Sequence, residues 1–138
     1  MANTRGIFMG TTSISPEKTV AEITVVLVKS GARQIATDYG PNGKLQGLRF
    51  VIEANGCSLG FSLPVRTEAL LRRIGNRDQA ERVAWRQLLR WTQAQLAMID
   101  VGMVRADEVY APYMLTPDGR TLYNLLTESK YRALPAPA

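Results

Sequence analysis

Residues 78–103 read DQAERVAWRQLLRWTQAQLAMIDVGM and form the longest segment of the chain with one clear period. At about 100° per residue, the large apolar side chains fall on one half of a helix. Arginines at positions i, i+4 and i+8 fall on the other half. The segment therefore predicts one long amphipathic helix. Its apolar members are Ala84, Trp85, Leu88, Leu89, Trp91, Leu96, Met98 and Ile99.

Positive charge is concentrated in this segment and just before it. The chain carries a formal net charge of +5, and from Arg66 to Arg90 seven arginines stand against three acidic residues. Arginine offers a planar donor fork that suits phosphate and carboxylate groups, and it stacks on bases. The candidates for nucleic-acid contact are therefore Arg66, Arg72, Arg73, Arg77, Arg82, Arg86 and Arg90.

The ridge formed by Arg82, Arg86 and Arg90 has two interpretations. Like charges at i, i+4 spacing destabilise a helix by roughly a few tenths of a kcal/mol per pair. The ridge therefore favours an anionic partner, and polynucleotide phosphate would serve. Alternatively, the ridge is a solvated face, or acidic residues from elsewhere in the fold pair with it.

Missing residue types exclude several kinds of chemistry. The chain has no histidine and a single cysteine, Cys57, which removes Ser-His and Cys-His catalysis, a disulfide within the chain and the usual zinc sites. We expect no catalytic residue, no metal site and no cofactor, and we predict that the protein is not an enzyme.

Membrane insertion and secretion are not expected either. No apolar run approaches the ~18 residues of a membrane span. Residues 1–10 lack the apolar core of a signal peptide. We therefore expect a cytoplasmic protein.

The residues before the long helix predict one helix and three antiparallel strands. Ser15 and Pro16 begin a helix over residues 16–30, because Ser is a good N-cap and the missing N–H of Pro costs nothing there. Strands follow on both sides of the Asn55-Gly56 pair, which is preferred in type I′ hairpins. One face of this sheet is apolar, and the long helix is expected to cover it.

The remaining segments complete an α+β fold with a single domain over residues 15–131. A short helical piece is expected over 67–74, with Asn76 or Asp78 as the cap of the long helix, and two shorter helices over 106–114 and 121–130. Residues 1–14 are interpreted as an extended N-terminal arm, and residues 132–138 as a Pro/Ala tail.

The aromatic residues are predicted to serve mainly the core. Trp85 and Trp91 lie on the apolar half of the long helix, Trp91 towards one edge, so we expect packing more readily than base stacking. Tyr113 and Tyr123 are also expected to pack. One or two of the other tyrosines could stack on bases beside a basic groove.

Three segments resemble parts of small proteins encoded in phages and prophages: Ser15-Pro16-Glu17-Lys18-Thr19, Ala84-Trp85-Arg86 and Asp118-Gly119-Arg120-Thr121. Separately, the order of helix, three-stranded meander and long helix is similar to the core of Rad52-type single-strand annealing proteins. The segment from Arg82 to Leu96 resembles the helix behind their sheet. This resemblance implies rings of subunits that hold DNA backbone in a basic groove. The resemblance is one of topology.

The favoured functional hypothesis is a nucleic-acid-binding protein. It would bind single-stranded DNA, anneal it as a homo-oligomer, and contact neighbouring subunits through the N-terminal arm. The competing hypothesis is a protein-interaction or assembly module, either a phage structural component or an inhibitor, that docks on an acidic protein surface.

Overall fold

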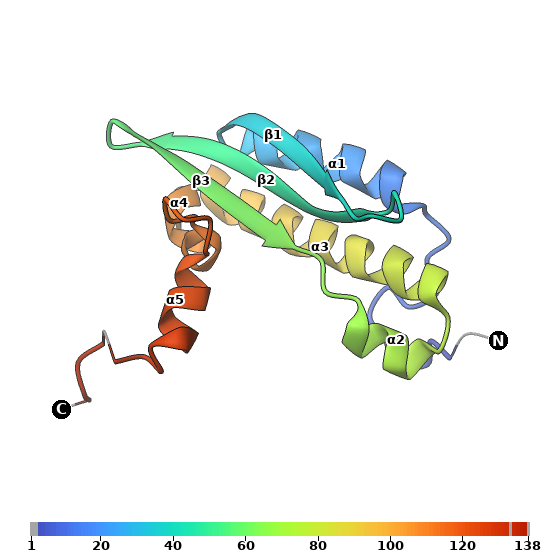
Figure 1. The fold of residues 1–138 in the computed structure, drawn as a ribbon. Helices are drawn as coiled ribbons and strands as arrows, with labels where there is room; N and C mark the ends of the chain where they lie inside the picture. The colour runs from blue at the N-terminus through green and yellow to red at the C-terminus, as the bar shows by residue number, and fades with distance from the viewer. Residues whose placement is uncertain (1–2, 133, 138) are drawn as a thin grey trace.

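The structure is a computed structural model that describes residues 3–132 and 134–137. Met1, Ala2, Ala133 and Ala138, which belong to the expected arm and tail, lie outside the described residues. The predicted α+β class and order of elements are confirmed (Figure 1). The elements are α1 (Pro16–Lys29), β1 (Ala32–Tyr39), β2 (Leu45–Ala54), β3 (Cys57–Pro64), α2 (Glu68–Ile74), α3 (Arg77–Asp100), α4 (Ala106–Val109), the short helix η1 (Ala111–Tyr113) and α5 (Leu122–Glu128).

The two main helices begin at side-chain caps. The Ser15 hydroxyl accepts a hydrogen bond from the Lys18 N–H at 3.2 Å, and Pro16 follows at the first helical position. At the start of α3, the Asn76 side-chain oxygen accepts from the Gln79 N–H at 2.9 Å. Asn76 is therefore the cap, and Asp78 is left to interact elsewhere.

The sheet is an antiparallel meander in the order β1-β2-β3. Asn55 and Gly56 connect β2 to β3 with φ values of 53° and 79°, as a type I′ turn requires. In the register, Phe50 lies opposite Ile35 on one side and Phe61 on the other. The Phe50 and Phe61 rings stack with centroids 5.0 Å apart. The predicted hairpin is confirmed.

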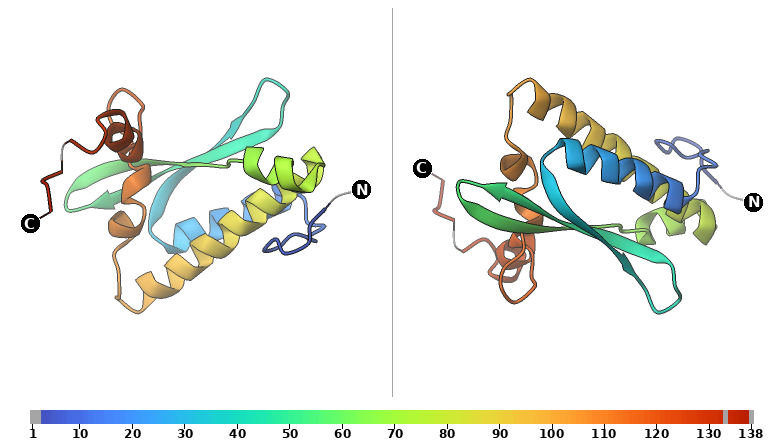
Figure 2. Two further views of the ribbon diagram at one scale, coloured as in Figure 1. Left: turned by 90° about the horizontal axis from the view of Figure 1, so that it is seen from below. Right: turned by 90° about the horizontal axis from the view of Figure 1, so that it is seen from above.

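One face of the sheet is covered by α1 and α3, which lie side by side (Figure 2). Trp85 and Leu89 of α3 are buried there together with Ile23 and Leu27 of α1. The long helix thus shares its covering role with α1. The prediction that Trp85 is a core residue is confirmed, since its exposed fraction is 1%.

The expected helical segment over residues 106–114 is present but interrupted, because α4 and η1 are separate short pieces. Pro112 has no N–H to donate to a carbonyl one turn earlier, which disfavours an α-helix that continues through it. After η1, Met114 bridges Phe61, and the Leu115 N–H donates to the Gly60 carbonyl at 2.7 Å. This segment therefore lies along the outer edge of β3.

The N-terminal segment is folded onto its own chain. It forms successive turns, such as the Gly10 N–H donating to the Ile7 carbonyl at 2.9 Å. The Gln79 side-chain amide of α3 donates to the Gly10 and Thr12 carbonyls at 2.8 and 2.9 Å. Ile7 packs against Ile74 and its buried neighbours. Turns thus replace the expected extended conformation over residues 5–6 and 8–11, and Ile7 packs within the chain, whereas Phe8 stays 62% exposed.

Within the described ranges, the structure contains no helix with the length and apolar character that crossing a membrane requires.

Candidate nucleic-acid interface

Arg86, the middle member of the predicted ridge, is buried between α1 and α3 with an exposed fraction of 6%. Its Nη1 lies 3.0 Å from Glu22 Oε2 and 3.3 Å from Thr19 Oγ1. Thr19 and Glu22 are three residues apart on α1 and so share the face that meets α3. Arg86 therefore cannot contact an external phosphate. For this residue the alternative interpretation, pairing with an acid from elsewhere in the fold, is correct.

The other two ridge residues lie in different surroundings. Arg82 donates from Nε and Nη2 to Gln79 Oε1 at 2.9 and 2.6 Å, and the same Gln79 holds the N-terminal segment. Arg90 is exposed and donates to Gln93 Oε1 at 2.8 Å. The predicted ridge is therefore not one continuous basic face in the folded protein.

Three other predicted arginines do come together. Arg66, Arg72 and Arg77, with Lys44, line a hollow of about 640 Å³ between the β1–β2 turn, α2 and the start of α3. We call these four residues and the space between them the basic hollow. The three arginines are exposed, and none forms an ion pair with a described residue. Glu68 and Glu81 also line the hollow.

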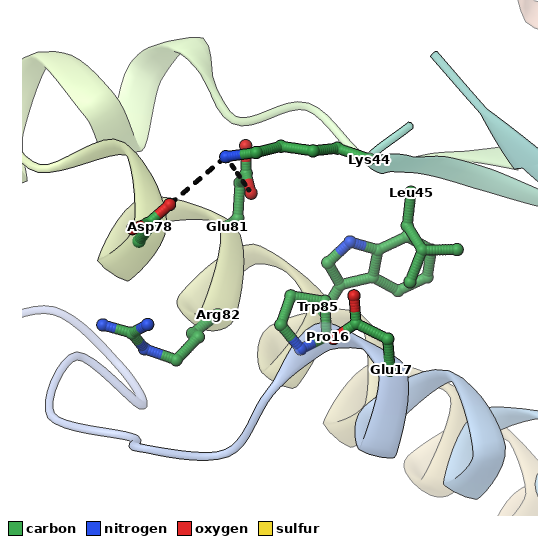
Figure 3. Close-up of a pocket in the computed structure, with 8 residues that line it drawn as sticks. All are labelled: Pro16, Glu17, Lys44, Leu45, Asp78, Glu81, Arg82 and Trp85. Atoms are coloured by element: carbon green, nitrogen blue, oxygen red, sulfur yellow. Dashed lines mark hydrogen bonds and ion pairs between the residues drawn. The ribbon is translucent and has the colours of Figure 1, made fainter. Parts of the chain in front are cut away.

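Lys44 partly neutralises the acidic side of this region (Figure 3). Its Nζ lies 3.2 Å from Asp78 Oδ1 and 3.5 Å from Glu81 Oε2. The hydrogen bond to Asp78, followed by attraction to Glu81, raises the pKa of Lys44. Because these two carboxylates already face a cation, the unpaired arginines are the groups left to attract an anion.

A second hollow, of about 180 Å³, lies where α1 begins, beside the β1–β2 turn (Figure 3). Its walls carry the carboxylates of Glu17, Asp78 and Glu81 as well as the cations of Lys44 and Arg82. This mixture of charges makes it a poor phosphate site.

A third hollow, of about 290 Å³, adjoins the basic hollow, and both are lined by Val65 and Arg66. Most of its remaining wall is apolar or aromatic. We call it the apolar hollow. Its lining residues are Leu63, Pro64, Val65, Arg66, Leu70, Ala84, Gln87, Leu88, Trp91 and Tyr113.

Sequence reasoning missed two groups in this region. Lys44 follows a turn and has no periodic signal, and only the β1–β2 hairpin brings it to α3. The apolar hollow joins residues from β3, α2, α3 and η1, which are distant along the chain. Arg73, the remaining candidate, is exposed on α2 but lines none of the three hollows.

Acidic residues that lie close together in the sequence of α1 and α4 have structural partners in the fold. Glu22 pairs with Arg86, and Asp107 pairs with Arg105 at 3.0 Å. Glu108 accepts from the Arg105 N–H at the start of α4. In the described part of the chain, no three His, Cys, Asp or Glu residues are grouped so that they could hold a metal ion.

Comparisons of this chain with protein-family models, with curated proteins and with solved structures found no match.

Proposed function

We propose that the protein binds nucleic acid, with the phosphate backbone held in the basic hollow. The observation that carries this proposal is the grouping of Arg66, Arg72 and Arg77, all exposed and without an acidic partner among the described residues. Three guanidinium groups around one hollow repel one another, and an anion placed between them relieves that repulsion.

Phosphate is the anion that best suits this arrangement. Each guanidinium can donate two parallel hydrogen bonds to phosphate oxygens. Binding several phosphates of one strand also releases counterions, which favours association at low salt. Arg72 lies in α2 and Arg77 at the first turn of α3, so helical backbone holds both positions.

The test compares two variants with the same change in net charge. Replacing Arg66, Arg72 and Arg77 with Gln should weaken binding of a labelled single strand at low salt by about tenfold or more. Arg33, Arg105 and Arg132 are exposed but lie outside the hollow. Replacing these three with Gln should weaken binding of the same strand much less. Fluorescence anisotropy measures both. Equal losses in the two variants would show that only the total charge matters and that the basic hollow is not the site.

The finer form of the proposal is annealing of complementary single strands by a homo-oligomer, in a phage or prophage setting. Light scattering in the binding buffers gives the oligomer mass, and the rate of pairing of two labelled complementary strands gives the annealing activity. An oligomer that accelerates pairing supports this form. A monomer that does not accelerate pairing would contradict the annealing proposal, and only the proposal of nucleic-acid binding would remain.

The second candidate function is an assembly module, and a separate surface favours it. On α1, the side chains of Val25 and Val28 are 53% and 56% exposed. Beside this helix, β1 pairs only with β2 among the described strands, so its other edge is open. Open strand edges are templates for pairing with another chain. Two results together would support this function. The wild-type protein would be an oligomer that binds neither DNA nor RNA at low salt, and the double substitution Val25→Lys with Val28→Lys would convert it to monomers.

A further inference from the structure

We propose that the apolar hollow accepts one unpaired base of a single strand whose phosphates lie in the basic hollow. This inference rests on the proposed function and adds to it the kind of strand that is bound. Its starting point is the contact between the two hollows, since Arg66 and Val65 line both. In a polynucleotide each base is attached, through its sugar, to a phosphate. A phosphate site that shares a wall with an apolar site therefore matches the covalent structure of one strand.

The walls of the apolar hollow suit a flat aromatic ligand. Trp91 of α3 and Tyr113 of η1 both line it, and their rings meet edge to face with centroids 6.1 Å apart. Leu70 and Leu88 add aliphatic surface from α2 and α3. Nucleic-acid bases stack on aromatic side chains with little dependence on sequence, because every base has a π-face.

The hollow also has polar groups that can meet the edge of a base. Gln87 uses its amide nitrogen to donate to the Phe8 carbonyl at 2.9 Å. Its side-chain oxygen, which has no hydrogen bond to a described residue, can accept from a base. Arg66, at the shared wall, can stack on a base or bind the adjoining phosphate. The hollow therefore offers hydrogen-bonding and stacking groups to a base as well as apolar surface.

The size of the hollow favours an unpaired base. At about 290 Å³ it lies at or just below the lower end of the usual range for ligand pockets. A base within a duplex is stacked between its neighbours and paired, so it cannot enter such a hollow without being extruded. Single strands should therefore bind more tightly than duplexes of the same sequence.

The first experiment uses the unmodified protein and two single strands of equal length and charge. One is oligothymidylate, and the other is an abasic strand with the same phosphate backbone. Anisotropy should show about tenfold tighter binding of oligothymidylate. Tryptophan emission should be quenched by oligothymidylate alone. Because Trp85 is only 1% exposed, the quenching would report on Trp91.

The second experiment assigns the preference to a residue. Trp91→Leu should bind both strands with the affinity that the wild-type protein has for the abasic strand. Tyr123→Leu is the matched control, because Tyr123 is an aromatic residue, 41% exposed, that does not line the apolar hollow. This control should keep the full preference for bases. Retention of the preference in Trp91→Leu would contradict the assignment to this hollow.

The outcomes separate this inference from the proposed function. Equal binding of the two strands by the wild-type protein would overturn the base site while leaving phosphate binding in place. No binding of either strand at low salt would overturn the proposed function itself. The wild-type comparison needs no substitution, so it remains decisive even if Trp91→Leu fails to fold.

Discussion

At the scale of single residues, Arg86 shows that the fold can bury a charge that the sequence pattern places on a surface. Its side chain lies against Glu22 and Thr19, and removing it leaves a partly buried carboxylate without its cation. Arg86→Met should therefore lower the free energy of unfolding by about 1–3 kcal/mol. Urea denaturation measures this change.

Arg90, one helical turn later and exposed, provides the control for this prediction. Arg90→Met should change the free energy of unfolding by no more than about 0.5 kcal/mol. Similar losses in the two variants would mean that the ion pair between α1 and α3 adds little to stability. Because Arg86 is buried and paired with Glu22, replacing Arg82, Arg86 and Arg90 together would disturb the fold as well as the surface charge. That triple variant would not be a clean test of nucleic-acid binding.

Tyr110 is a second buried residue with a polar group. Its ring packs against Phe50 and Trp91, and its hydroxyl has no hydrogen-bond partner among the described residues. Burial raises its pKa. The Ser30 hydroxyl is not free to stabilise a phenolate there, because its proton is donated to the Val26 carbonyl at 2.9 Å.

The raised pKa gives a pH prediction. The folded protein holds the Tyr110 proton more tightly than the unfolded chain does. The contribution of this proton to the free energy of unfolding is therefore complete below about pH 10, the ordinary pKa of tyrosine, and is lost as the pH rises above it. Tyr110→Phe should therefore lose stability less steeply than the wild type in urea denaturations above about pH 10. At neutral pH the variant should be as stable as the wild type or more so, since it loses an unpartnered hydroxyl. Parallel pH curves would contradict this account.

At the scale of elements, the β2–β3 hairpin offers a paired test. Gly56 has a φ of 79°, whereas Gly60 has an ordinary φ, and a Cβ there would meet only the Leu115 side chain at 3.6 Å. Gly56→Ala should destabilise the protein by about 1 kcal/mol, and Gly60→Ala should be close to neutral. Thermal unfolding of the two variants measures the difference. Equal shifts in Tm would show that the left-handed turn does not control hairpin stability.

Elements with local signals could be predicted from the sequence. The Ser15 cap, the Asn55-Gly56 turn and the period of the long helix each depend on neighbouring residues, and the structure contains all three features. The interrupted helix at Pro112 was missed because a proline can also be tolerated within a helical pattern. The N-terminal segment was misjudged because its partners, Ile74 and Gln79, are about seventy residues away.

At the scale of the whole molecule, the two hollows arise only when the elements come together. The basic hollow needs the β1–β2 turn to place Lys44 beside α3, and the apolar hollow needs η1 to place Tyr113 beside Trp91. Charge pattern alone made Arg66, Arg72 and Arg77 candidates for phosphate contact. It could not separate them from Arg86, because burial is a property of the assembled fold.

The most direct test of the central claim is the salt dependence of single-strand binding. Each phosphate contact on a single strand adds about −0.7 to the slope of log K against log[salt]. The three arginines, which have no acidic partner among the described residues, should therefore give a slope of about −2. Replacing Arg66, Arg72 and Arg77 with Gln should reduce its magnitude by about 2. An unchanged slope would contradict the claim that phosphates lie in the basic hollow.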